Sequence, residues 1–378
     1  MSRLSAPALR PPGTVRLVAT AVGLVGVLTL LVLAFLWPAA TSQPRGIRVA
    51  VAGPPAVVAA LAGTLPAGGA FDVTPVPDRA AAVAAIESRD VVGALVVGRQ
   101  PEVLAASAAG TQLSQAMTAL AGQAQQALQA QADAAATATG RAAGHVTVTV
   151  TDVVPLSPDD ARGIGFTVGM YPLVIGGILG GVGLWLTVAG PWRRSTAILV
   201  YAVAAGLALA AVMRSWFGTL QGSWWAQAAA VALMLAAIAG PVAGLAAWLG
   251  WPGVPVGSVL MLLLGNPLSG VTVPEQFLPA PWGAVGQWLP PGAGGSLLRD
   301  LSYFPSADAT RPWLVLGTWA LAGLALGVAR PARPAVADPT PPAMVAVAGT
   351  PRDGDVIPVA PATDVPSSAG LTTASPPA

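Results

Sequence analysis

The feature that most constrains this chain is a set of long stretches without a charged residue. One of them extends from Arg214 to Glu275, and another from Leu17 to Pro44. A helix needs about 20 apolar residues to cross roughly 30 Å of hydrocarbon, and these stretches are long enough. Only 9% of the residues are charged, against roughly 25% in an ordinary soluble domain. The sequence therefore predicts a polytopic α-helical membrane protein and argues against a soluble globular enzyme.

The composition also excludes several kinds of functional site. There is no Cys, so disulfides, thiolate metal sites and Cys nucleophiles are excluded. There is no Lys, which a nucleotide-binding Walker A loop requires, and His145 is the only His. A net charge of +2 does not indicate a nucleic-acid-binding protein. We expect no catalytic, cofactor-binding or metal-ligating residues, no cofactor and no nucleic-acid partner, and we interpret the chain as a non-enzyme.

The charge-free stretches predict six transmembrane helices in contact with the lipid bilayer. The first follows a short cytoplasmic N-terminus, 1–16, and we interpret it as an uncleaved anchor. A signal peptide cleaved after Pro38-Ala39-Ala40 is the alternative. The later spans belong to a five-helix transmembrane domain, 166–330. The six predicted spans are 17–37, 166–189, 195–213, 223–250, 254–266 and 312–329.

Arginine residues near the ends of the spans predict the orientation, because cytoplasmic loops carry the excess of positive charge. With six crossings, the arginines of the N-terminus, the pair Arg193 and Arg194, and the pair Arg330 and Arg333 all lie on the cytoplasmic side. The prediction is a multi-pass protein of the plasma (inner) membrane with both termini in the cytoplasm.

The fifth predicted span is too short to cross the bilayer alone. Its thirteen residues rise about 20 Å as a helix, and Asn266-Pro267 then breaks it. We expect short, broken helices at the outer leaflet near 267–304, with Pro290 and Pro291 as a second break.

Two further regions lie outside the predicted spans. The extracytoplasmic region 38–165 predicts an α/β domain, with strands at 47–52, 71–76 and 91–97 in a small parallel sheet and a fourth strand at 145–154. Pro54 opens one predicted helix and Asp78 caps another. Ser157-Pro158 looks like the start of a helix that continues into the second span. The Pro-rich tail 331–378 is predicted to be disordered in the cytoplasm.

Small residues at four-residue spacing mark the second and fourth spans. Such residues let helix backbones approach closely in lipid. Two interpretations remain open for them, packing within one chain and a dimer seam or sliding gate. The absence of ionisable residues from the spans argues against a proton-driven antiporter. The packing or gate candidates are Gly169, Gly176, Gly180, Gly240 and Gly244.

Several short motifs carry a resemblance to a known family. They are Gly265-Asn266-Pro267-Leu268-Ser269-Gly270, Trp288-Leu289-Pro290-Pro291-Gly292, Leu298-Arg299-Asp300 with Tyr303-Phe304, and Val153-Val154-Pro155-Leu156. With the plan of one anchor, a large outer domain and five further spans, the chain resembles permease subunits of type-2 ABC exporters. It is most similar to the actinobacterial branch related to phage-infection-protein (YhgE/Pip-like) membrane proteins.

The resemblance implies a permease subunit that forms a homodimer or pairs with another permease. A separate ATP-binding subunit would drive it, and a hydrophobic or amphipathic cargo would cross the plasma membrane. In such exporters an amphipathic cytoplasmic helix precedes the first span, whereas here 1–16 is short and contains three prolines. The alternative is a non-transporting envelope receptor or secretion-system scaffold that binds a partner through its extracytoplasmic domain.

Overall fold

The computed structural model describes residues 13–329, apart from 56–68, 99, 141 and 143. Five of its helices are long and apolar enough to cross a membrane, and they make this chain a membrane protein. The last turns of α6 continue as a π-helix, Val212–Trp216. The five helices are α1 (Thr14–Ala40), α5 (Ile164–Thr187), α6 (Pro191–Ala211), α7 (Trp224–Leu249) and α11 (Thr310–Val328).

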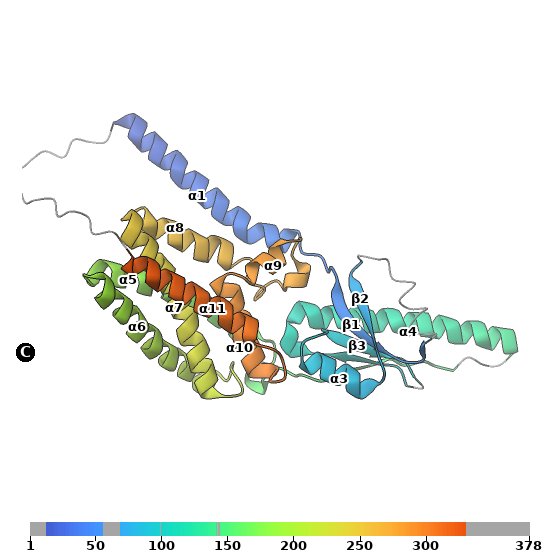
Figure 1. Ribbon diagram of the computed structural model, residues 1–378. Helices are drawn as coiled ribbons and strands as arrows, with labels where there is room; N and C mark the ends of the chain where they lie inside the picture. The colour runs from blue at the N-terminus through green and yellow to red at the C-terminus, as the bar shows by residue number, and fades with distance from the viewer. Residues whose placement is uncertain (1–12, 56–68, 99, 141, 143, 330–378) are drawn as a thin grey trace, which may run out of the picture. The chain divides into compact units, whose positions relative to one another are not determined.

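Helix α7 is the central helix of the bundle (Figure 1) and packs against α5, α6 and α11. In its most apolar window 78% of the residues are buried, against 28% in each of those three neighbours. Ala and Gly on several faces of α7 let all three neighbours approach, while Val231, Leu235 and Ile238 fill the space between them. The core of the bundle is therefore built around α7.

The fifth predicted span corresponds to a shorter apolar helix that is not among the five. It is made of α8 (Gly253–Val259) and a π-helical continuation, Leu260–Gly265. A 3₁₀ turn (Glu275–Phe277) and two helices, α9 (Trp282–Gly286) and α10 (Pro290–Tyr303), follow it. We refer to residues 266–304 as the interrupted segment.

The sheet domain, residues 47–152, contains five strands in the order β2-β1-β3-β4-β5. The sequence correctly predicted β1, β2 and the parallel pairing of β1 with β2 and β3. It missed β4, which pairs antiparallel with β3 because the connection from Val97 to Pro101 is too short for a crossover. The small parallel sheet expected for the first three strands is present, and β4 extends it as an antiparallel strand. The strand bounds are β1 (Ile47–Ala52), β2 (Phe71–Val76), β3 (Gly93–Val96), β4 (Glu102–Ala105) and β5 (Thr149–Asp152).

Two helices cover the sheet. Helix α3 (Arg79–Glu87) begins as predicted, with the Asp78 carboxylate accepting a hydrogen bond from the Ala81 amide at 2.8 Å. Helix α4 (Thr111–Thr139) buries Leu113 and Met117 against the sheet. The helix predicted to open at Pro54 falls largely in 56–68, and the tail 331–378 also lies outside the described residues.

The start of the second span differs from the sequence-based expectation. Ser157 caps only a 3₁₀ turn (Pro158–Asp160), and Gly163 at φ +67° separates that turn from α5. The Asp160 carboxylate then accepts hydrogen bonds from the Gly165 and Phe166 amides, at 3.0 and 2.8 Å. The helix therefore starts anew at Ile164, because the left-handed glycine ends the first turn and Asp160 supplies the cap.

Helix α1 makes few contacts with the rest of the described chain. None of its apolar window is buried, and most of its Leu and Val side chains are exposed. Near its end, the Trp37 ring meets the Trp282 ring edge-on, with centroids 6.2 Å apart. The Gln43 amide then donates to the Phe277 carbonyl at 3.2 Å, so the chain enters the sheet domain beside the interrupted segment.

Candidate functional site

The candidate glycines of α7 lie against α11. A Cβ atom built on Gly244 would stand 2.7 Å from the Gly323 carbonyl oxygen, and one on Gly240 would stand 3.4 Å from the Ala320 carbonyl oxygen. In return, a Cβ on Gly323 would overlap the backbone nitrogen of Pro241. These glycines therefore bring the two backbones together within one chain.

The candidate glycines of α5 also face helices of the same chain. Gly169 lies against the Met213 side chain, and Gly176 and Gly180 lie against Tyr201 of α6. The Tyr201 hydroxyl donates to the Gly176 carbonyl at 2.8 Å. Gly177 and Gly181, which the four-residue stripe did not include, make the close approach to α7. All five candidate glycines are thus used in packing between helices of this chain.

We expect Gly323→Ala to lower the free energy of unfolding by about 2 kcal/mol, because the new methyl group meets backbone atoms of α7 that cannot move separately. Chemical unfolding of the purified protein in detergent, followed by tryptophan fluorescence, measures the change. Gly317→Ala is the matched control on the same helix, since its Cβ would meet nothing within 4 Å. That control should be neutral or stabilising, because Ala favours helix. Equal losses in both variants would contradict the packing interpretation.

The two predicted helix breaks, Asn266-Pro267 and Pro290-Pro291, lie close together in the structure. The π-helix ends at Gly265, and buried Asn266 occupies the C-cap position before Pro267. A Cβ on Gly265 would stand 2.8 Å from the Pro291 side chain. Pro290 and Pro291 are the first residues of α10, where a missing N–H costs nothing. The end of the π-helix and the start of α10 therefore lie against each other.

The interrupted segment and the sheet domain share one hydrophobic core. Sheet residues such as Val103 and Leu104 belong to the same buried cluster as Phe277 of the 3₁₀ turn and Phe304 at the end of α10. Phe304 is 2% exposed. The sheet domain is therefore packed onto the segment that interrupts the helices, and its position is not left to a linker.

A buried ion pair joins α10 to the sheet domain. The Arg89 guanidinium donates to the Asp300 carboxylate, and it also lies over the Phe304 ring, 5.2 Å from its centroid. Arg89 adopts φ +61°, which is uncommon for a residue other than Gly. Burial raises the pKa of the Asp300 carboxyl, and the charges of Arg89 and Arg299 oppose that rise. This part of the junction is therefore electrostatic as well as apolar.

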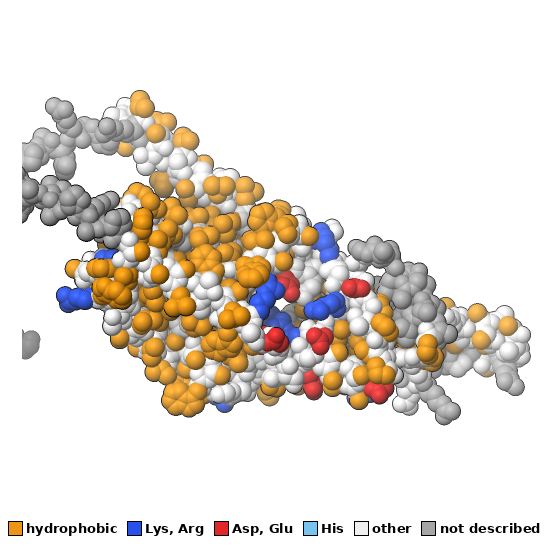
Figure 2. All heavy atoms as spheres, in the orientation of Figure 1, with side chains coloured by type: hydrophobic (Ala, Val, Ile, Leu, Met, Phe, Trp, Pro, Cys, Tyr) orange, Lys and Arg blue, Asp and Glu red, His pale blue; other side chains and the backbone are white. Residues whose placement is uncertain are grey.

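Charged side chains gather beside this ion pair. On the face shown in Figure 2, Arg, Asp and Glu side chains form a band next to the apolar surface of the helices. Arg299, Asp300 and Ser302 of α10 are buried. The sequence analysis used Leu298-Arg299-Asp300 only as a family motif. The signal it passed over was a pair of opposite charges inside a segment otherwise expected to be buried.

The fold and this junction define a membrane protein whose α/β domain is packed on a broken helical segment. No protein-family model, no curated protein and no solved structure matches the chain. Among the described residues, no group of three or more His, Cys, Asp or Glu side chains could hold a metal ion.

Proposed function

We propose that this protein is the permease subunit of a type-2 ABC exporter, driven by a separate ATP-binding subunit. In this proposal it moves a hydrophobic or amphipathic cargo across the plasma membrane, with both termini in the cytoplasm and two permease copies per transporter. The short helix of residues 253–265 is then the fifth of the six crossings, completed at the outer leaflet by the interrupted segment.

One observation carries the proposal: the sheet domain, the end of the π-helix at Gly265 and the start of α10 are packed as one unit. A sheet domain held this way moves when the helices move, which a transport cycle requires. The described spans support an apolar cargo as well, since their buried faces carry Leu, Val, Ile, Ala and Gly. Arg193 and Arg194 lie in the first turn of α6, at the end proposed to face the cytoplasm.

The test is a mild-detergent purification of the tagged full-length chain from its native membranes, with mass spectrometry of the proteins that accompany it. We expect an ATP-binding subunit in roughly equal amount, and ATP-dependent movement of a fluorescent lipid probe in vesicles that contain both. Preparations that carry no ATP-binding subunit, or complexes that hydrolyse ATP without moving any apolar probe, contradict the proposal.

A pair of tryptophans gives a matched comparison for the proposed orientation. Trp192 at the start of α6 is 73% exposed, and Trp225 at the start of α7 is 72% exposed. In the proposed topology α6 and α7 cross the membrane in opposite directions, so the two tryptophans lie on opposite sides of it. We expect Trp192→Ala to reduce the amount of co-purified ATP-binding subunit and Trp225→Ala to leave it unchanged. The reverse result would contradict the proposed orientation.

The second candidate is an envelope receptor or secretion-system scaffold. The observation that favours it is the packing of all five candidate glycines against helices of the same chain. In that case an envelope protein accompanies the chain through its sheet domain, no ATP-binding subunit is recovered, and substitutions on α7 affect stability alone.

A further inference from the structure

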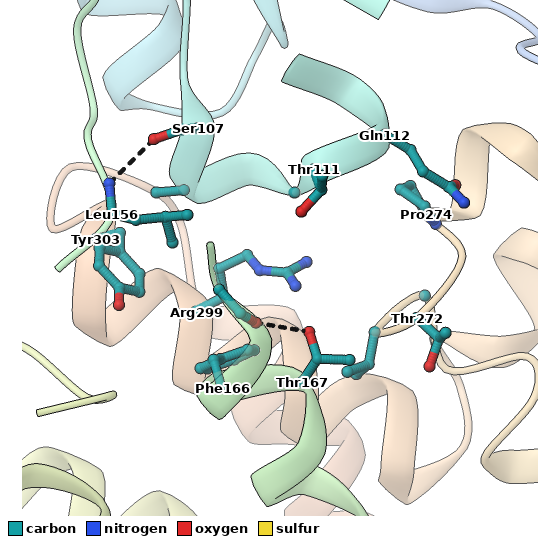
Figure 3. Close-up of a pocket in the computed structure, with 15 residues that line it drawn as sticks. Ser107, Thr111, Gln112, Leu156, Phe166, Thr167, Thr272, Pro274, Arg299 and Tyr303 are labelled. Atoms are coloured by element: carbon teal, nitrogen blue, oxygen red, sulfur yellow. Dashed lines mark hydrogen bonds between the residues drawn. The ribbon is translucent and has the colours of Figure 1, made fainter. Parts of the chain in front are cut away.

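A cavity of about 60 Å³ lies where the sheet domain meets the first turn of α5 (Figure 3). Thr111 and Gln112 at the start of α4 form one wall, and Phe166 and Thr167 of α5 form another. The side chain of Arg299, from α10, extends between these walls. One water needs about 10–15 Å³ by this measure, so the cavity has room for a group of a few non-hydrogen atoms.

Arg299 is a buried cation without a hydrogen-bonding partner. Its side chain belongs to a residue that is 9% exposed, and it makes no hydrogen bond or ion pair with any residue that the structure describes. The guanidinium lies over the Phe166 ring, 5.1 Å from the centroid. Burial lowers the pKa of Arg299 to about 10, so the guanidinium stays charged at neutral pH. A buried charge without a counter-charge is costly.

The neighbouring carboxylates are already engaged. Asp300 is paired with Arg89, so the two arginines and this one carboxylate leave one positive charge at the junction. Asp160 accepts the hydrogen bonds of the Gly165 and Phe166 amides that start α5. Neither carboxylate forms an ion pair with Arg299, so its guanidinium can bind a further anion, for which the cavity has room.

The start of α4 favours an anion independently. The N-cap residue Gly110 cannot cap with a side chain, so no side chain satisfies the first amides of this 29-residue helix. Those amides and the helix dipole attract negative charge. Beside them, the Gln112 side-chain oxygen is buried and accepts no hydrogen bond from the described residues. A ligand here needs both an anionic group and a hydrogen-bond donor.

We propose that this cavity binds a phosphate group with a single negative charge, held by the Arg299 guanidinium and the first amides of α4, with a hydroxyl of the ligand donating to Gln112. The planar guanidinium matches two oxygens of a phosphate. A glycerol phosphodiester has the required charge and hydroxyl. It can come from the headgroup of an anionic lipid or from a soluble phosphodiester such as glycerophosphoglycerol. The cavity lies at the start of α5, a helix able to cross the membrane, and lipid headgroups lie where such helices leave the hydrocarbon.

The test uses the full-length chain, freed of native lipid, and follows thermal unfolding by tryptophan fluorescence. Separate samples receive phosphatidylglycerol, phosphatidylcholine, soluble glycerophosphoglycerol or no addition. We expect phosphatidylglycerol or glycerophosphoglycerol at saturation to raise the unfolding midpoint by about 5 °C. The additive that raises the midpoint shows whether the bound phosphate comes from a lipid headgroup or from a soluble compound. Phosphatidylcholine, which lacks the hydroxyl and the net charge, should have little effect. No rise with either glycerol compound, or an equal rise with phosphatidylcholine, overturns the proposal.

Arg299→Met separates this site from general lipid effects. Without ligand the variant should unfold at the same or a higher temperature, because an unpaired buried charge is gone, and the ligand-dependent rise should disappear. Arg311→Met is the matched control, since Arg311 is exposed and also lies over an aromatic ring, Trp288, at 4.8 Å. That control should keep the rise.

A second variant covers the case in which Arg299→Met does not fold. Gln112 is partly exposed, so Gln112→Leu should fold and weaken binding about tenfold, which corresponds to the loss of one hydrogen bond. A rise retained in Arg299→Met, or wild-type affinity in Gln112→Leu, overturns the assignment of these residues.

Discussion

Phe304→Ala is expected to lower the free energy of unfolding by about 4 kcal/mol, the typical cost of emptying a buried Phe site. The Phe304 side chain is almost fully buried in the core shared by the sheet domain and the interrupted segment. The Arg89 guanidinium also lies over the face of this ring. The substitution therefore removes apolar contact and a cation–π contact at once. Denaturant unfolding of the full-length chain in detergent measures the loss.

Phe217→Ala is the control for this prediction. Phe217 is 58% exposed and stacks on Trp216 at the end of the π-helix, away from the shared core. We expect a small effect, within about 0.5 kcal/mol, as for most exposed positions. If the two substitutions cost the same, the shared core does not hold the sheet domain on the helices.

Asp300→Ala is expected to lower the free energy of unfolding by about 3 kcal/mol, because it leaves the partly buried charge of Arg89 without its carboxylate and removes the negative charge near buried Arg299. This is the lower end of the usual range, since the Arg89 side chain is 30% exposed. The same unfolding experiment at neutral pH measures it. Adding Arg89→Ala to Asp300→Ala should recover part of the loss, because one of the uncompensated charges is then absent.

The ion pair of Arg79 with Glu102 is the control for Asp300. It lies on the surface of the sheet domain with a distance of 2.8 Å from Nε to the carboxylate. The hydrogen bond from Arg79 lowers the pKa of Glu102, but water screens the exposed pair. Glu102→Gln should therefore leave the unfolding transition nearly unchanged at neutral pH.

The double variant of Asp300 and Arg89 tests the cause of the loss. If it is no more stable than Asp300→Ala alone, the Arg89 charge is not the cause.

These two predictions bear differently on function. The exporter and the scaffold both require a folded sheet domain, but only the exporter requires the domain to move with the helices. A variant such as Asp300→Ala that folds with a weakened junction should lose transport before it loses partner binding. The reverse order, with binding lost first, favours the scaffold.

The sequence by itself determined the elements whose signals are local. The charge-free stretches located the five long helices, because one-dimensional hydropathy suffices to find a segment that can cross a bilayer. The sequence also located β1 and β2 as short strands and α3 by its Asp78 cap, because a short strand and an N-cap each depend on a few neighbouring residues. The short helix before Asn266-Pro267 was likewise visible from length and proline chemistry.

The tertiary structure decided everything that depends on distant residues. Spacing could not say which glycine of α5 meets which helix, and Gly177 and Gly181 made the contact with α7 that the stripe had not included. The antiparallel β4, the pairing of Arg89 with Asp300 and the position of Arg299 beside the start of α4 join segments far apart in the chain. Such contacts follow from three-dimensional packing and charge balance, which no local pattern encodes.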